Sequence, residues 1–417
     1  MKKTRTGLML ASLLLVCAMA VNLAGCSAEV RAKNLMEGVT PKKVSASGDL
    51  SAQNADVTDF AVRLFQASEK SGENTLISPL SVLCALAMTA NGADGETLEQ
   101  MEAVLGMTAE ELNRYLYSYM KSLPQGKDNK LSLANSIWFT EDKRFTVNQD
   151  FLQLNADYYG ADIYQAPFND QTCKDINNWV KQNTDGMIPK ILEQIPPEAV
   201  MYLVNALAFE AEWSKTYEKH QVRDGTFTKE DGTQQNAEFM YSTEGAYLED
   251  EKATGFMKYY QGGRYAFAAM LPNEGVSVSD YIASLSGESL NAMLANPQYT
   301  TVQASIPKFE MEYSVEMSEI LEGMGMPRAF DPDSAEFERL GVFASGNIYI
   351  SRVLHKTFIS VGEKGTRAGA ATIIELDGES AMADPKLVYL NRPFVYMLID
   401  CENNIPFFIG TMMDMKP

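Results

Sequence analysis

Histidine and cysteine are scarce in this chain, and their scarcity excludes several kinds of site. The 417 residues contain two histidines, His220 and His355, and neither has a cysteine or a second histidine at zinc-ligand spacing. The cysteines show no paired spacing, so we expect Cys84, Cys173 and Cys401 to be buried free thiols or to form at most one disulfide. Phosphate-cradling glycine loops are absent as well. The sequence therefore indicates no metal site and no cofactor.

Recognisable hydrolase motifs are also missing. Neither histidine lies in a motif such as GxSxG or HExxH, which argues against serine-type and zinc-type hydrolysis. His220 follows a charged run and is interpreted as a solvated loop residue, whereas His355 lies in a long apolar stretch and is interpreted as a hydrogen-bonded core histidine. We therefore expect no enzyme, although a carboxylate-pair hydrolase stays open as an alternative because two carboxylates leave no spacing to detect.

Basic residues are outnumbered in this chain. Against 55 Asp and Glu there are 35 Lys and Arg, which gives a formal net charge of −20. This balance argues against nucleic acid or anionic lipid headgroups as partners and favours solubility.

The first 25 residues have the order of a secretory signal peptide. Basic residues come first, and the apolar stretch Gly7 to Val21 that follows is too short to span a membrane. The sequence Leu-Ala-Gly-Cys ending at Cys26 resembles the lipobox of bacterial lipoproteins, which implies lipidation of Cys26. A simple cleavage site with a chance cysteine is the alternative. We expect an exported protein anchored by acyl chains to the outer face of a bacterial membrane or cell surface.

The mature chain divides into two parts. Residues 26–55 are polar and small, without apolar periodicity, and are interpreted as the lipidated Cys26 followed by a flexible tether. Residues 56–417 show no comparable linker, repeat or low-complexity segment. They are long enough for one large domain or two intimately fused lobes with an ample core.

Helix signals dominate the first half of this domain, and strand signals dominate the second. Helical apolar spacing predicts helices over Asp56–Lys70, Ser78–Ala90, Thr97–Leu105, Ala109–Leu123 and Asp175–Gln182. Apolar, β-branched runs predict strands over Val200–Phe209, Ala266–Leu271, Thr301–Ile306, Ile348–Val361, Phe394–Asp400 and Phe407–Met412. This order is typical of the α+β class.

The segment from Glu363 to Glu379 combines the properties of a strand and of a loop. Its even-numbered positions from Thr366 to Gly378 are small or apolar, while Arg367, Glu375 and Asp377 have the opposite parity. Its first half is nevertheless rich in Gly and Ala, and a loop-like run follows it. We interpret the segment as a two-state device, with an ordinary half-buried strand as the alternative.

Five motifs in order resemble the serpin family over essentially the whole of residues 56–417. They are the SPLS start and the GADGET turn within 74–100, INNWVKQNTDGMIPKIL at 176–192, VNALAFEAEW at 204–213, and VYLNRPFVYML at 388–398. The resemblance implies an α+β serpin fold, with helices packed on a large mixed central sheet, smaller sheets and an exposed reactive-centre loop. It also implies a monomer and a covalent acyl-enzyme complex with a serine protease.

On this resemblance the two-state segment is the reactive loop. Its hinge comprises Glu363, Gly365, Thr366, Ala368, Gly369, Ala370, Ala371 and Thr372. The resemblance also assigns control of sheet opening to Ser78, Ser81, Asn205, His355 and Trp213, the shutter and breach residues. Ordinary roles are open for the same residues: a helix N-cap for Ser78, and satisfied buried polar groups for Asn205 and His355.

The family's usual loop length places the scissile bond between Glu379 and Ser380. About three extra residues precede Pro393, so Ala381-Met382 and Met382-Ala383 are alternative bonds. No Lys or Arg lies between Thr372 and Pro385, which argues against trypsin-like targets. We expect a suicide inhibitor of extracellular serine proteases of the elastase-like or subtilisin-like kind. A non-inhibitory serpin that acts as a surface binding protein is the alternative within the fold.

Overall fold

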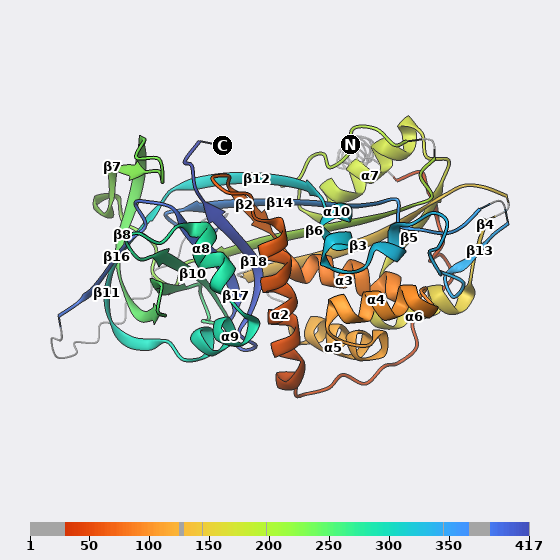
Figure 1. Cartoon of the computed structure of the whole chain (residues 1–417), viewed down its shortest axis with the longest axis horizontal. Helices are drawn as coiled ribbons and strands as arrows, with labels where there is room; N and C mark the ends of the chain where they lie inside the picture. Colours follow the sequence, from red (N-terminus) through yellow and green to blue (C-terminus); the bar gives the residue numbers. More distant parts are fainter. Residues whose placement is uncertain are drawn as a thin grey trace, which may run out of the picture.

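The structure is a computed structural model that describes residues 30–124, 129–143, 145–196, 198–344, 346–366 and 384–416. Its helices gather around two large β-sheets (Figure 1). The helices are α2 (Ser51–Ser68), α3 (Pro79–Ala90), α4 (Gly95–Leu105), α5 (Ala109–Ser122), α6 (Gln149–Tyr159), α7 (Asp170–Asn183), α8 (Val278–Ser284), α9 (Gly287–Ala295) and α10 (Ser318–Met324), with 3₁₀ turns η1 (Lys219–Gln221) and η2 (Pro327–Phe330).

The first sheet is the central one, and it is mixed. Its strand order is β1 (Lys33–Asn34), β5 (Asp162–Ala166), β3 (Asn129–Thr140), β6 (Met201–Glu212), β15 (Gly365–Thr366), β14 (Arg352–Gly362) and β12 (Phe309–Glu316). Helix α7 covers one face, and α3 lies on the other with α4, α5 and α6 beyond it (Figure 1). Strands β6 and β14 run parallel and also pair directly with each other.

The second sheet is built mainly from the C-terminal half. Its order is β16 (Lys386–Tyr389), β11 (Gln298–Pro307), β8 (Gln234–Glu249), β9 (Ala253–Tyr259), β10 (Tyr265–Pro272), β17 (Phe394–Asp400), β18 (Ile405–Met412) and β2 (Thr75–Ile77). Strand β7 (Val222–Thr228) pairs with β8, and β4 (Phe145–Val147) pairs with β13 (Gly341–Phe343) in a separate ribbon. The expected α+β architecture, with helices packed on a large mixed central sheet, is therefore confirmed.

Helix α3 shows how the SPLS motif works. Ser78 is its N-cap and accepts a hydrogen bond from the backbone N–H of Ser81, while Pro79 occupies the first helical position, where no N–H is needed. All twelve residues of α3 are buried, because strands β3, β6 and β18 and helices α2, α4 and α5 surround the helix. The motif thus starts a helix whose whole surface is core.

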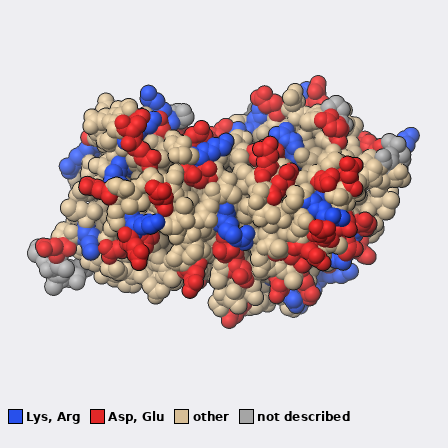
Figure 2. All heavy atoms as spheres, viewed as in Figure 1, with Lys and Arg blue, Asp and Glu red and all other residues tan. Residues whose placement is uncertain are grey.

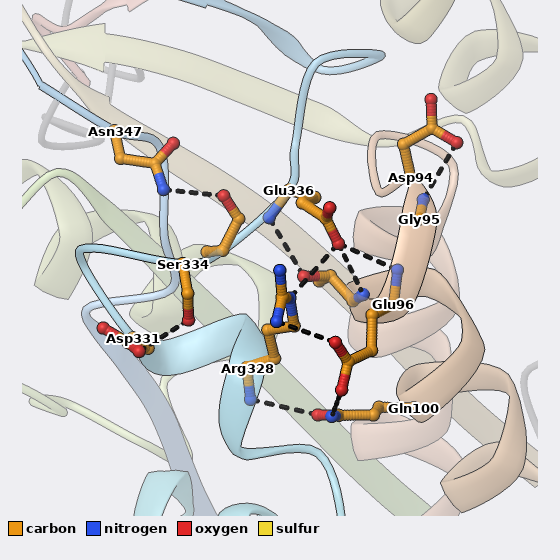
Figure 3. Close-up of polar contacts among 11 residues, drawn as sticks. Asp94, Gly95, Glu96, Gln100, Arg328, Asp331, Ser334, Glu336 and Asn347 are labelled. Carbon is orange, nitrogen blue, oxygen red and sulfur yellow. Dashed lines mark hydrogen bonds and ion pairs between the residues drawn. The ribbon is translucent and has the colours of Figure 1, made fainter.

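The turn between α3 and α4 is fixed by contacts with a distant carboxylate (Figure 3). Glu336 accepts hydrogen bonds from the backbone N–H groups of Glu96 (2.8 Å) and Thr97 (3.3 Å), and from Nε of Arg328 (3.2 Å). Gly95 has a φ of +50°, a backbone conformation that other residues adopt only with strain, and a Cβ there would also lie within 2.8 Å of that carboxylate. The GADGET motif is therefore a structural joint.

The expectation of a flexible tether up to residue 55 is wrong for the part that the structure describes. Helix α2 begins at Ser51, and residues 30–50 lie along the domain. Strand β1 pairs with β5, the N–H of Leu35 donates to the carbonyl of Ile163 (2.8 Å), and the N–H of Ser47 donates to the hydroxyl of Ser118 (2.8 Å). Polar composition concealed this packing, because backbone groups make most of these contacts and they carry no sequence signal.

Candidate functional site

The two-residue strand β15 marks the candidate site, because it lies between β6 and β14 at one end of the central sheet. Gly365 is opposite Glu212 of β6, and Thr366 is opposite both Ala211 of β6 and Val361 of β14. Glu363 and Lys364 form the tight turn that leads from β14 into β15. The chain thus enters the sheet at its hinge and runs antiparallel to both neighbours.

Gly365 is required by the closeness of β6. A Cβ at this position would lie 2.1 Å from the carbonyl oxygen of Ala211, a backbone atom that cannot move aside without disturbing β6. A substituted residue 365 could not occupy this place, so the hinge would have to leave the sheet.

Two stacked aromatic residues, Tyr260 and Trp213, contact the hinge through hydrogen bonds. The hydroxyl of Thr366, which is 2% exposed, lies 2.5 Å from the hydroxyl of Tyr260. The Tyr260 ring stacks on Trp213, and burial raises the Tyr260 pKa well above its ordinary value. The indole of Trp213 donates to the carbonyl of Gly362 (2.8 Å), and its backbone N–H donates to the carbonyl of Lys364 (2.9 Å). Trp213 and Tyr260 together clamp both ends of the turn.

The Glu363 carboxylate is tied by charge to the second sheet. Nζ of Lys308 lies 2.9 Å from Glu363 and 3.1 Å from Glu238, and its hydrogen bond lowers the pKa of Glu363. The backbone N–H of Tyr217 donates to the Glu363 carbonyl (2.9 Å). A cavity of about 800 Å³ lies beside this turn, with Glu363 and Tyr217 in its wall.

A buried lysine, Lys258, lies next to Trp213, with Nζ 5.5 Å from the centre of the Trp213 ring. Nζ of Lys258 is 2.8 Å from the Glu244 carboxylate and 4.4 Å from the centre of the Tyr217 ring. Lys258 is 2% exposed, so the ion pair and the aromatic ring together replace its lost hydration. Tyr260, Lys308 and Lys258 carry no signal in the sequence that marks them as site residues, because their partners lie 14 to 106 residues away.

The four predicted shutter residues meet midway along the central sheet. The backbone N–H of Ser78 donates to Nε2 of His355 (3.0 Å), and Nδ1 of His355 lies in hydrogen-bond contact with Oδ1 of Asn205. The hydroxyl of Ser81 donates to the same oxygen (3.3 Å). Because Nε2 accepts, the proton is on Nδ1, and burial lowers the His355 pKa to about 3. The core histidine and the helix N-cap are thus both present.

Strands β6 and β14 are paired where these four residues meet. His355 and Asn205 are direct register partners within the paired stretches 352–356 and 202–206. Among described residues no pairing joins the next stretches, 207–210 and 357–360, and β15 lies between the strands beyond them. The sheet is therefore closed at the shutter and already parted at the hinge.

Some of the residues expected to be functional lie within the described ranges and others do not. Those on Cys26, on Ala368 to Thr372 and on Glu379 to Ala383 lie outside the described residues. His220 is exposed beside Glu218, which agrees with a solvated position. In the described ranges Cys84, Cys173 and Cys401 are free.

Neither a metal centre nor a membrane helix is found in the part of the chain that the structure covers. No cluster of three or more His, Cys, Asp or Glu residues there could hold a metal ion. Within the same ranges, every helix is too short or too polar to cross a bilayer. On the face in Figure 2, basic side chains are interspersed with acidic ones.

The chain is similar to a known protein family over most of its length. The family model described as serpin (serine protease inhibitor) matches residues 55–415. An uncharacterized serpin-like protein of Thermococcus kodakarensis is 30% identical over 371 residues, which cover 86% of this chain and 85% of that protein. The thermophilic serpin tengpin in its native state is 50% identical with a TM-score of 0.88, covering 92% of this chain and 100% of tengpin. The latent state of tengpin is 48% identical with a TM-score of 0.78, covering 90% and 100%.

Proposed function

The chain belongs to the serpin family, and we propose that it is a suicide-substrate inhibitor of extracellular serine proteases. Serpins are generally non-enzymatic inhibitors or binding proteins, and insertion of the cleaved loop into a sheet is the known mechanism of the inhibitory ones. The observation that carries the proposal is β15, a hinge that already lies between the two strands that must part.

In the proposed reaction the protease serine attacks the carbonyl of Glu379, and the amine of Ser380 leaves. The resulting ester joins the protease to the N-terminal side of the cut, which is then free to enter the sheet. On insertion, an extension of the β15 register would place residues 367–375 between β6 and β14, each opposite one residue of β6 and one of β14. The even-numbered residues would face the α3 side with Leu203, Leu207, Phe209, Val353 and Ile359.

The same register gives the charged residues suitable neighbours. Arg367 would lie opposite Glu210 of β6, and Glu375 would lie opposite Arg352 of β14. Both positions have the parity of the α7 side, where Glu210 and Arg352 are partly exposed. Insertion therefore buries small or apolar groups on one face and pairs opposite charges on the other.

The free energy expected from loop insertion is large enough to distort the active site of the bound protease. About ten new ladder residues, at about 0.5 to 1.5 kcal/mol per hydrogen bond, give on the order of 10 kcal/mol. This is comparable to the stability of a whole domain, and a displacement of catalytic groups by about 1 Å costs roughly a hundredfold in rate. Hydrolysis of the acyl-enzyme would then stall.

Insertion must break the shutter. In the extended register Thr372 comes between Asn205 and His355, whose direct contact would be lost. Strands in a sheet lie about 4.8 Å apart, so β6 and β14 would separate to roughly twice that distance. The shutter lies within the paired stretch of β6 and β14 that must part before the loop is fully inserted.

Target and location follow from the sequence expectations. Glu379 suits a protease that accepts an acidic residue, whereas Ala381, Met382 or Ala383 would suit elastase-like or subtilisin-like pockets. Lipidation of Cys26 would hold the inhibitor, as a monomer, on the outer face of a membrane.

A panel of serine proteases tests the proposal. Incubation with wild-type protein should give an SDS-stable covalent complex with at least one of them, and mass spectrometry of the released C-terminal peptide should identify the cut bond. Complete cleavage by every protease, without any complex, would contradict inhibition and favour a non-inhibitory serpin.

A further inference from the structure

Exposed hydrophobic side chains gather on strand β16. Of the large hydrophobic residues in the described ranges, four are exposed, and two of them, Leu387 (63%) and Tyr389 (38%), lie on this strand. Strand β16 pairs in parallel with β11, and its other edge has no partner strand within the described part of the chain. An exposed edge that carries apolar side chains is a frequent site of protein association.

The two side chains extend a surface formed by other strands. Residues 387 and 389 share one face of the sheet because strand side chains alternate. The Tyr389 ring lies edge-on to Tyr241 of β8, with centroids 6.2 Å apart, and the Arg223 guanidinium of β7 lies 5.6 Å from the Tyr241 ring centre. We call these four residues, Leu387, Tyr389, Tyr241 and Arg223, the β16 face. Tyrosine and arginine are among the side chains enriched at interface hot spots.

The proposed scissile bond is close to the β16 face along the chain, so a protease bound there must lie near this face. Five residues lie between Ser380 and Lys386, the first residue of β16, and the six Cα–Cα steps from Ser380 to Lys386 span at most about 20 Å when fully extended. A protease domain of roughly 225 residues has a radius of gyration of about 17 Å. A protease bound at the scissile bond is therefore large enough to reach the β16 face.

We propose that the β16 face is a docking surface for the target protease, a proposal that rests on the inhibitory function above. The occupant is a serine protease with an apolar surface patch and a carboxylate next to its active-site cleft. The apolar patch would cover Leu387 and Tyr389, and the carboxylate would meet Arg223. Docking would lengthen the encounter before acylation and so raise the rate of inhibition. It would not change the fraction of acylated protease that becomes trapped.

The test compares a double variant, Leu387→Ser with Tyr389→Ser, with Val342→Ser. Val342 is 62% exposed on β13, at the opposite end of the molecule from β16 (Figure 1), which makes it a matched control. With the protease that forms the covalent complex, the double variant should lower the second-order inhibition constant by about tenfold. The inhibition stoichiometry should stay at the wild-type value, and Val342→Ser should change neither quantity.

A second variant separates docking from recognition of the cleaved segment itself. Arg223 lies more than 150 residues before the scissile bond, so Arg223→Ser can act only through the folded surface. A fall of about threefold is expected for this variant. Wild-type rates for the double variant and for Arg223→Ser would overturn the proposal. So would self-association of the wild type that the double variant abolishes while its inhibition rate is unchanged.

Failure of the inhibitory function would look different. The wild type would then be cut without a covalent complex, and kcat/KM for that cleavage would serve as the docking readout. A tenfold lower kcat/KM for the double variant would still support docking, whereas an equal value would overturn it.

Discussion

Replacing Thr366 by arginine tests the account at the residue where the hinge enters the sheet. Thr366 is 2% exposed, lies between Ala211 and Val361, and shares a hydrogen bond with Tyr260. Arginine at position 366 would bury a guanidinium beside the Tyr260 hydroxyl, and no carboxylate is among the described side-chain partners of this position. The intact variant should therefore hold its hinge outside the sheet, and the cleaved variant should fail at the first step of insertion.

The size of the effect follows from these contacts. Loss of the hydroxyl contact costs about 1 kcal/mol, and an uncompensated buried charge costs about 3 to 5 kcal/mol. Together these are roughly half of the 10 kcal/mol order estimated for insertion. If about 4 kcal/mol falls on the insertion barrier, insertion slows roughly a thousandfold, and hydrolysis of the acyl-enzyme overtakes it.

The assay is the stoichiometry of inhibition together with the fraction of SDS-stable complex. Thr366→Arg should be cleaved at the wild-type bond while many molecules are consumed per protease inactivated. Thr366→Ser keeps the hydroxyl and should behave as wild type, and Thr366→Val should form the complex despite losing the Tyr260 contact. Unchanged stoichiometry for Thr366→Arg would refute the assignment of residue 366 to the buried face.

Three further predictions concern the shutter, the α4 joint and the anchor. The His355 pKa is about 3 in the folded protein and 6.5 in the unfolded chain, so its contribution to stability is present above about pH 6.5 and is lost as the pH falls toward 3. Between pH 7 and 5 the wild type should lose about 2 kcal/mol from this residue in urea unfolding, and His355→Gln should lack that component; equal slopes for both would count against the neutral buried histidine. Glu336→Ala removes the acceptor of two α4 N–H groups and should cost about 1 to 2 kcal/mol, seen as a lower thermal midpoint, while an unchanged midpoint would show that water caps the helix equally well. Cys26→Ser should leave the membrane fraction, and its retention there would show that the anchor is wrongly assigned.

Local patterns allowed much of the fold to be predicted from the sequence. Helix α3 has the predicted end at Ala90 and the predicted cap at Ser78, and β17 has the predicted bounds, because capping residues and apolar runs act over short distances. Strand β3 was missed, because its sequence mixes Asn, Ser, Lys and Ala with few β-branched residues. Residues 30–50 were misassigned as a tether because their hydrogen bonds to the domain are mostly made by the backbone and their few apolar side chains, such as Leu35, Met36 and Val39, show no periodicity.

In the candidate site, residues within family motifs could be singled out from the sequence, whereas residues brought in by the strand register could not. The family resemblance singled out Ser78, Asn205 and His355, and the structure places them in contact, while their control of sheet opening stays a prediction. The Lys308 and Tyr260 contacts with the hinge could not be predicted, because each joins residues far apart in the sequence through a particular strand register. Composition has no information about such a register.

The most direct test of loop insertion is the heat resistance of the nicked chain. The chain is cut between residues 379 and 383 by a protease that does not remain bound, and the thermal midpoints of the cut and intact forms are compared. A domain of roughly 360 residues has an unfolding entropy of about 0.8 kcal/mol per degree, so a gain of about 10 kcal/mol should raise the midpoint by more than about 10 °C. A cut form that melts at the same temperature as the intact protein would contradict insertion between β6 and β14.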